Sequence, residues 1–323
     1  MIRHARHLCL RSLMTGCLVI IACSRPPVVA EAIAELRIAS WNLNNLHYLE
    51  NEALRKDAPE RSAEDLDTLR RYVARLDADI VALQEVNGPD AAALLFPKSH
   101  YEVYFSARYA QDRDQDSETD HIYTGFAVRR GVFDRVQAVD RAELSVLTPS
   151  GRPVRHGLEL LVERDGKTLA LLNVHLKSGC FARSLEPART PACDTLARQR
   201  APLERWIDQT FESAVPFVVL GDFNRAFDVH GARDHLWEEI NDGSPAGLDL
   251  HRLPFRREPA CWAGTRAHHD HPIDFFVFGP RAWKLVDPDS FTELVFEAKD
   301  ANPGRGTPSD HCPIAVTLDW GQD

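Results

Sequence analysis

One short segment, Phe217–Asn224, carries the clearest chemical signal in the chain. It begins with four apolar residues rich in β-branched side chains, a pattern typical of a buried strand. Gly221, Asp222, Phe223 and Asn224 follow. An ionised carboxylate beside a buried strand is costly unless a cation or hydrogen bonds compensate its charge. Asp222 is therefore predicted either to close the strand in an Asx turn or to help hold an ion, and this segment alone fits both interpretations.

Five further segments combine a strand-like apolar run with polar residues at one end. They are Leu36–Trp41 before Asn42 and Asn44, Asp79–Gln84 before Glu85, Leu169–Val174 before His175, Lys177 and Ser178, Ile273–Phe278 with Asp274 near its start, and Cys312–Leu318 after Asp310 and His311. Carboxylates and carboxamides suit a hard cation, and His and Lys suit a phosphate. The whole set predicts a site for one divalent cation and one phosphate ester.

The intervening segments must bring these groups together. Helical spacing of apolar residues predicts one helix from Ser62 to just before Asp79 and another over Leu196–Phe211. Further predicted elements are strands at Tyr101–Phe105 and Tyr123–Val128, a hairpin of Gly157–Val162 with Thr168–Val174, a short helix around Leu236–Ile240, and polar loops at Asn44–Glu60 and Asp112–Glu118. Strands alternating with helices predict an α/β fold.

Composition and charge limit the function classes. The chain has 323 residues, of which 44% are hydrophobic and 27% charged, so it can bury a large core and lacks a disordered composition. No Pro/Gly/Ser-rich linker divides the motifs, which predicts one large domain. The formal net charge of −10 argues against tight non-specific binding of nucleic acid, but it does not exclude a nuclease that turns over quickly.

The first residues predict an export signal at residues 1–22. Arg3, Arg6 and Arg11 precede the apolar stretch Leu13–Ala22, which is shorter than the roughly 20 residues needed to span a bilayer. Cleavage after residue 22 would change the net charge from −10 to −13, since three arginines and no acids are lost.

Two cleavage sites remain open for this signal. The segment Ile20–Cys23 resembles the bacterial lipoprotein box, in which a lipidated Cys23 would anchor the protein to a membrane. Ordinary cleavage near Ala30–Ala32 is the alternative. We expect an exported protein that is periplasmic, anchored to the outer membrane or secreted.

Three of the seven cysteines, Cys9, Cys17 and Cys23, belong to the predicted leader, and exported proteins often pair their remaining cysteines in disulfides. Cys180, Cys193, Cys261 and Cys312 allow three connectivities. A Cys180–Cys193 bond would close a loop just after His175, and a Cys261–Cys312 bond would then hold the strand that follows His311. A zinc site is the weaker alternative, because the chain has no C-x-x-C pair.

In their order along the chain, the motifs resemble the endonuclease/exonuclease/phosphatase superfamily. The resemblance rests on Trp41-Asn42, Gln84-Glu85, Asn173-Val174-His175, Gly221-Asp222-Phe223-Asn224, Ile273-Asp274 and Ser309-Asp310-His311. It implies one deoxyribonuclease I-like domain over residues 34–321, folded as a four-layer α/β/β/α sandwich of two mixed sheets flanked by helices. It also implies a divalent cofactor, Mg²⁺ or alternatively Mn²⁺ or Ca²⁺.

The resemblance assigns roles to the polar residues. It implies that Glu85 is the principal Mg²⁺ ligand, with help from Asn42 and Asp310. It also implies that Asp222 orients or deprotonates the attacking water and that Asn224 holds Asp222. His311, which Asp274 holds in place, would stabilise the charge on the phosphate. His175 would protonate the leaving oxygen. The implied substrate-binding residues are Asn44, Tyr123, Lys177 and Ser178, although Tyr123 fits a core tyrosine equally well.

Two features fall outside the family pattern. Phe275 stands where many relatives carry His or Tyr, so it either points into the core or changes the substrate contacts. The run His268–His271 looks like a metal cluster, but adjacent loop residues do not all converge on one ion. It is interpreted as a polar loop near the substrate.

Together these observations predict an exported, Mg²⁺-dependent phosphodiesterase. Nucleic acid, DNA or RNA, is the expected substrate, because the run Asn173–Gly179 resembles secreted nucleases more than lipid phosphatases. A sphingomyelinase-type headgroup hydrolase and an inositol phosphate phosphatase are alternative enzymes. A catalytically inactive binding module is the alternative of another class, and no feature indicates a protein partner.

Overall fold

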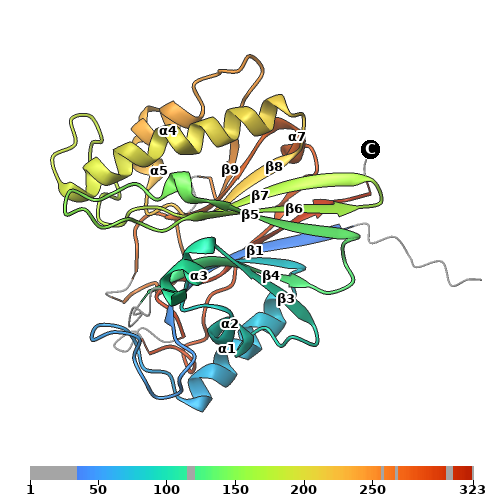
Figure 1. Ribbon diagram of the computed structural model, residues 1–323, viewed down its shortest axis with the longest axis vertical. Helices are drawn as coiled ribbons and strands as arrows, with labels where there is room; N and C mark the ends of the chain where they lie inside the picture. The colour runs from blue at the N-terminus through green and yellow to red at the C-terminus, as the bar shows by residue number, and fades with distance from the viewer. Residues whose placement is uncertain (1–34, 115–120, 256–257, 266–267, 303–307, 322–323) are drawn as a thin grey trace, which may run out of the picture. The chain divides into compact units, whose positions relative to one another are not determined.

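The apolar strand patterns pair into two six-stranded sheets (Figure 1). The computed structural model describes residues 35–114, 121–255, 258–265, 268–302 and 308–321. The first sheet has the order β11 (Val286–Glu293), β12 (Ile314–Asp319), β1 (Glu35–Leu46), β2 (Ile80–Val86), β4 (Tyr123–Arg129) and β3 (Tyr101–Phe105). The second has the order β5 (Arg135–Arg141), β6 (Gly157–Arg164), β7 (Lys167–His175), β8 (Phe217–Asp222), β10 (Asp274–Phe278) and β9 (His251–Leu253).

Both sheets are mixed, and each has one parallel pair at its centre. Strand β1 runs parallel to β2 and β7 parallel to β8, whereas the other described pairs are antiparallel. The polar residues at the carboxyl ends of the parallel strands therefore gather at one edge of each sheet.

Helices cover the outer faces of the sheets, as Figure 1 shows for α4 (Pro191–Glu212) on one side and α1 (Ala63–Leu76) with α2 (Pro89–Ala93) on the other. The remaining helical segments are short: α3 (Ala107–Asp114), α5 (Phe227–His230), α6 (His235–Ile240), α7 (Pro280–Trp283), and two 3₁₀ turns, Ala142–Leu144 and Gly231–Arg233. The predicted four-layer α/β/β/α sandwich is confirmed. No helix in the described part of the chain is long and apolar enough to cross a membrane.

Alternating side chains along the strands build the layers. On β8, Val218 and Leu220 belong to the core between the sheets, whereas Phe217 and Val219 belong to the core that includes Leu203 of α4. A third core packs α1 against the outer face of the first sheet. Because both faces of the central strands are covered, these strands appear in the sequence as continuous apolar runs.

The predicted elements are present, with some different boundaries. The first strand extends to Leu46 instead of ending at Trp41, because Leu43 and Leu46 are buried in the core under α1. The polar loop predicted from Asn44 therefore starts only after this strand. The second long helix begins at Pro191, where Thr190 caps it by accepting a hydrogen bond from the Cys193 amide.

The prediction of a solvated polar loop at Asp112–Glu118 is wrong for the first residues of this segment. Asp112 lies in α3 and is buried, since its carboxylate binds Arg108 at 2.6 Å and accepts a hydrogen bond from the Tyr123 hydroxyl at 3.1 Å. Residues 115–118 lie outside the described residues, as does the predicted signal at residues 1–22 with Cys23.

Two disulfides join the four cysteines that follow Cys23 in the chain. Cys180 pairs with Cys193 and ties the segment after β7 to the first turn of α4. Cys261 pairs with Cys312, the residue that follows His311. These pairs leave no thiolate among the four for the alternative zinc site.

Candidate active site

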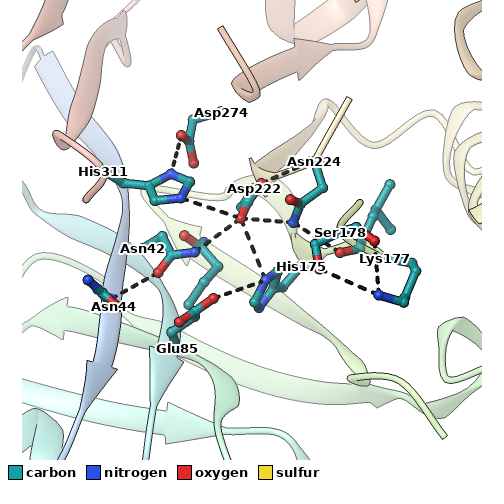
Figure 2. A network of polar contacts seen from close by, with 12 residues as sticks. Asn42, Asn44, Glu85, His175, Lys177, Ser178, Asp222, Asn224, Asp274 and His311 are labelled. Atoms are coloured by element: carbon teal, nitrogen blue, oxygen red, sulfur yellow. Dashed lines mark hydrogen bonds and ion pairs between the residues drawn. The ribbon is translucent and has the colours of Figure 1, made fainter. Parts of the chain in front are cut away.

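The polar residues predicted from the strand ends meet where the two sheets face each other. Figure 2 shows Asp222 in the middle of this network. Asn42 of β1 donates a hydrogen bond from Nδ2 to Asp222 Oδ2 at 3.0 Å, across the interface between the sheets. His175 Nε2 lies 3.5 Å from the same carboxylate oxygen and 3.6 Å from Glu85 Oε1. Groups from β1, β2, β7 and β8 therefore converge on one place.

A second buried contact fixes the two sheets next to this network. Gln84 of β2 donates from Nε2 to Asn173 Oδ1 of β7 at 2.8 Å. The Asn173 amide nitrogen in turn donates to the carbonyls of Leu83 and Gly125, at 2.9 and 2.7 Å. All polar atoms of the Asn173 side chain are thus used between the sheets, which sets the position of His175 two residues later.

Asp222 is held by several donors. Its Oδ1 accepts from the Asn224 amide at 2.8 Å, and its Oδ2 accepts from Asn224 Nδ2 at 3.0 Å as well as from Asn42. Burial raises the pKa of Asp222 to about 7, and the nearby Asp274 adds to this whereas His311 opposes it. The carboxylate is therefore rigid and has an unusually high affinity for a proton.

The backbone before Asp222 requires glycine. Gly221 has a φ of +134°, and a Cβ at this position would lie 2.1 Å from the Val174 carbonyl oxygen. Strands β7 and β8 can approach closely enough to bring His175 beside Asp222 only because this residue has no side chain.

His311 and Asp274 form a second unit of the site. His311 Nδ1 lies 2.7 Å from Asp274 Oδ2, so its Nε2 faces Asp222 at 3.9 Å. Asp274 pairs directly with Asp222 in the register of β8 and β10. Burial alone lowers the pKa of His311, but the carboxylates of Asp274 and Asp222 outweigh it and raise the pKa well above the usual value. The imidazolium form is therefore favoured.

His175 has the opposite environment. It is buried, and its Nδ1 has no hydrogen-bond partner among the described residues. Burial, followed by the positive charge of Arg155, holds the pKa of His175 well below its usual value. The site thus combines one imidazole that favours the charged form with one that favours the neutral form.

Glu85 reaches the site through an irregular backbone. Its φ is +56°, in the left-handed region, and the register of β2 shifts against both neighbouring strands around it. Such a conformation costs on the order of 1–3 kcal/mol in a non-glycine residue and is typical of functional positions. The carboxylate Oε2 accepts a hydrogen bond from Asn45 Nδ2 at 2.9 Å.

The oxygen atoms around Glu85 fit a hard divalent cation. Asn45 Oδ1 is buried without a hydrogen-bond partner among the described residues, close to the Glu85 carboxylate. A carboxylate beside an unpaired amide oxygen is a donor set that Mg²⁺ accepts. Asp222, Asp274 and His311 also lie close enough to hold an ion, but the raised pKa of His311 favours its protonated form, which cannot ligate a metal. We therefore favour Glu85 as the centre of the metal site.

The other two predicted ligands lie differently. Asn42 uses Oδ1 to accept from the Asn44 amide at 3.0 Å and Nδ2 to donate to Asp222, so in this structure it positions the network. Asp310 is exposed, and its charge and that of Glu85 both act on the buried Arg61. Their roles as ligands stay predictions.

Arg61 connects the end of β1 with the segment that precedes Asp310. Its Nη2 donates to the carbonyls of Leu43, Asn44 and Pro308, at 2.8, 3.0 and 3.2 Å. Burial lowers the pKa of Arg61 to about 10. This cation thus fixes the end of β1 against the segment that leads to His311.

The predicted substrate-binding residues occupy two places. Asn44 lies beside Asn42, whereas Lys177 and Tyr123 line one pocket of about 410 Å³. Lys177 Nζ donates to the Ser178 carbonyl at 2.9 Å, and Ser178 Oγ lies 3.5 Å from the same nitrogen. The Tyr123 hydroxyl is tied to Asp112, and burial raises its pKa.

The structure also shows where Phe275 and the run His268–His271 lie, the two features outside the family pattern. Phe275 is fully buried in the core under α4, so it does not face the substrate. His269 and His271 line a smaller apolar pocket of about 50 Å³ beside His311, together with Trp262. His268 contacts the Cys261 carbonyl from Nδ1 at 2.9 Å, so the histidine run does not converge on one point.

Sequence reasoning missed three residues of the site. Asn45, Arg61 and Arg155 follow no strand-end motif, and each acts through contacts made by distant segments. The adjacent pair Asn44-Asn45 was a signal that could have indicated Asn45. Arg61 directly precedes the predicted helix start at Ser62, and nothing local distinguishes it from a solvated arginine.

Comparisons with known proteins find similarity at the level of family and fold. The sequence profile of the Endonuclease/Exonuclease/phosphatase family matches residues 39–311. The chain is similar to DNA-(apurinic or apyrimidinic site) endonuclease 2 of Mus musculus, with 25% identity over an alignment of 333 positions that spans 88% of this chain. The match covers 60% of the length of that curated relative.

Two solved structures have a similar fold. The 3′-5′ exonuclease NExo from Neisseria meningitidis has a TM-score of 0.56 and 15% identity, and the match covers 88% of this chain and 100% of that one. D. rerio TDP2 in complex with single-strand DNA product has a TM-score of 0.53 and 19% identity, with coverage of 88% and 98%. At these identities the likeness concerns the fold alone.

Proposed function

Since the chain belongs to the endonuclease/exonuclease/phosphatase family, we propose that it is an exported, metal-dependent nuclease that hydrolyses phosphodiester bonds of DNA or RNA. The observation that carries this proposal is the convergence of His175, Asp222 and His311 beside Glu85, from both sheets. Hydrolysis of a phosphodiester needs a water held for attack, compensation of phosphate charge, and a donor near the departing oxygen.

The relatives support nucleic acid as the substrate class. The curated mouse relative is named an endonuclease for apurinic or apyrimidinic sites in DNA, and the TDP2 structure is described as a complex with a single-strand DNA product. We propose by analogy that this chain also acts on nucleic acid. The two disulfides are compatible with export, since such bonds persist in oxidising compartments.

Each catalytic group has a defined place in the proposed step. Asp222, fixed by Asn42 and Asn224, orients the attacking water and accepts one of its protons as the oxygen bonds to phosphorus. The bond from phosphorus to the departing oxygen then breaks, and that oxygen takes its proton from water.

The two histidines act on the phosphate in this proposal. His311 Nδ1 is bound to Asp274, so the Nε2 group of the imidazole is left to stabilise negative charge on the phosphate. His175 donates a hydrogen bond from Nε2 to the departing oxygen, in place of the full proton transfer expected from sequence.

Glu85 and Asn45 would hold the divalent cation, for which we propose Mg²⁺ because the donors are oxygen atoms. A bound cation would neutralise charge on the phosphate oxygens and hold the ester beside Asp222. Arg61 keeps the β1 end and the His311 segment together around this place.

The proposal is tested with purified protein in Mg²⁺ or in EDTA. The substrates are single-stranded DNA, duplex DNA, RNA, sphingomyelin and inositol phosphates, and the variants are Glu85→Ala, His311→Ala and the exposed control Glu238→Ala. We expect cleavage of nucleic acid that requires Mg²⁺, is lost in the first two variants and is retained in the control. Cleavage of sphingomyelin or inositol phosphates alone would reassign the substrate, and no cleavage of any substrate would favour the binding module.

A further inference from the structure

A basic pocket of about 410 Å³ adjoins the proposed catalytic centre. Five cationic side chains line it: Arg55, Arg108, Arg152, Arg155 and Lys177. A second hollow of about 680 Å³ shares Arg152 and Lys177 with it, so the two hollows adjoin, and we call them together the groove. This concentration of positive charge contrasts with the net charge of −10 for the whole chain.

Most of this charge is not neutralised within the protein. Arg108 is paired with Asp112 at 2.6 Å. By contrast, the side chains of Arg55, Arg152 and Arg155 have no hydrogen bond or ion pair with any described residue, and Lys177 Nζ contacts only Ser178. Unpaired like charges around one pocket repel one another, and a bound anion removes that repulsion.

The cations also influence one another. Burial lowers the pKa of Lys177, and the charge of Arg155 lowers it further. Burial likewise lowers the pKa of Arg155, which the charges of Glu85 and Asp222 oppose and the charge of Arg55 reinforces. Because these cations and Arg152 also line one pocket, they lie close enough together to act on a single ligand.

The groove begins at the catalytic centre. Arg155 interacts electrostatically with Glu85 and Asp222, and Lys177 follows His175 by two residues. A substrate whose scissile phosphate lies beside Asp222 would therefore extend into the groove with its neighbouring group. An anion is the favoured neighbour, because Arg55, Arg152 and Arg155 line this pocket and none of their side chains forms an ion pair or a hydrogen bond with a described residue.

We propose that Arg55, Arg152 and Arg155 form a second anion-binding subsite, which binds a phosphate adjacent to the scissile phosphodiester. This inference rests on the proposed function and narrows its substrate class to nucleotides and oligonucleotides that carry such a phosphate. Phosphocholine esters are disfavoured, since their quaternary ammonium would face the same arginines. The sphingomyelinase alternative is therefore weakened by the charge of the groove.

The test compares two chromogenic esters that differ by one phosphate. They are the 4-nitrophenyl ester of thymidine 5′-phosphate and the same ester with an added 3′-phosphate. We expect kcat/KM to be at least about tenfold higher for the second ester, the size of one charge-assisted hydrogen bond. This ratio should fall toward one in the double variant Arg55→Ala/Arg152→Ala and persist in Arg205→Ala, an exposed arginine of α4. A wild-type ratio near one, or a ratio that the double variant retains, would overturn the subsite.

Binding without turnover separates this proposal from the catalytic one. Calorimetry in EDTA measures thymidine 3′,5′-bisphosphate binding to the wild type and to the double variant. Binding that weakens about tenfold in the double variant supports the subsite even if no ester is hydrolysed. Binding that is absent, or equal in both proteins, contradicts it. Hydrolysis of bis(4-nitrophenyl) phosphate, and its loss in Glu85→Ala, tests the catalytic proposal by itself.

Discussion

Asn42 and Asp222 belong to different sheets, yet the Asn42 amide donates to the Asp222 carboxylate at 3.0 Å. The geometry of the proposed catalytic carboxylate therefore depends on how the two sheets stack. The neighbouring contact between Gln84 and Asn173, at 2.8 Å, crosses the same interface. The core of the sandwich thus positions the site directly.

The Asn42 contact predicts a loss of activity with retained folding. In Asn42→Ala the Asp222 carboxylate loses one of its three hydrogen bonds from described residues and keeps the two from Asn224, so its orientation becomes less defined. We expect kcat to fall about 10- to 100-fold, as is typical when a positioning partner of a catalytic group is removed. The measurement is hydrolysis of bis(4-nitrophenyl) phosphate together with circular dichroism. Asn51→Ala, in an exposed turn, is the control, and equal activity of both variants would contradict the role of Asn42.

Asp274 and His311 are predicted to act as one unit. Asp274→Asn weakens the 2.7 Å contact that orients the imidazole, and His311→Ala removes the imidazole itself. We expect each change to lower kcat by about 10²- to 10⁴-fold, and the double variant to lose no more than His311→Ala alone. Steady-state kinetics of the three variants measure this non-additivity. Losses that multiply in the double variant would show that the two residues act independently.

Gly221 is predicted to be irreplaceable for a steric reason beyond its backbone angle. In Gly221→Ala the added Cβ would lie 2.1 Å from the Val174 carbonyl, which forces β7 and β8 apart. We expect the free energy of unfolding to fall by at least about 2 kcal/mol, with loss of activity. Gly131→Ala is the matched control, because Gly131 also has a positive φ, +77°, but has open space around it. Urea unfolding of both variants measures the difference, and equal losses would leave only the backbone angle as the cause.

Much of the site could be predicted from sequence because its signal is local. A buried strand leaves a continuous apolar run, and a polar residue at its end stands out, as Glu85 and Asp222 do. Asn45, Arg61 and Arg155 could not be predicted in this way, since their partners come from distant segments. The burial of Asp112 depends on Arg108 and Tyr123 and is equally invisible in a run of charged residues. Strand β11 was missed because most of its side chains are polar and only Phe291 is buried.

A cluster of acids between α4 and α6 predicts a pH dependence of stability away from the site. Burial raises the pKa of Glu204 to about 7, and the charges of Glu239, Asp242 and Asp208 add to this whereas Arg200 opposes it. The folded state then binds a proton that the unfolded state releases at lower pH, so this group lowers stability as pH rises from about 4.5 to about 7. We expect Glu204→Gln to raise the melting temperature at pH 8 and to change it little at pH 4. A gain of the same size at both pH values would contradict the raised pKa.

The Cys261–Cys312 disulfide is predicted to support catalysis more than global stability. Cys312 follows His311 directly, and the bond holds it to the segment of Trp262, whose Nε1 donates to the Asp310 carbonyl at 3.0 Å. In Cys261→Ser/Cys312→Ser the His311 segment loses this covalent hold, while Trp41 Nε1 still donates to the His311 carbonyl at 3.0 Å. We therefore expect kcat to fall about tenfold or more, since a small misplacement of a catalytic group is costly.

The control for this variant is Cys180→Ser/Cys193→Ser, which opens the other disulfide, whose cysteines lie in the segment after β7 and in the first turn of α4. That bond closes a loop against α4, so its removal should lower the melting temperature while kcat of the remaining folded protein changes less. Kinetics and thermal unfolding of both variants separate the two effects. If the two variants lose activity only in proportion to their loss of folded protein, the Cys261–Cys312 bond has no special relation to His311, and noncovalent contacts such as those with Asp274 and Trp41 suffice to position this histidine.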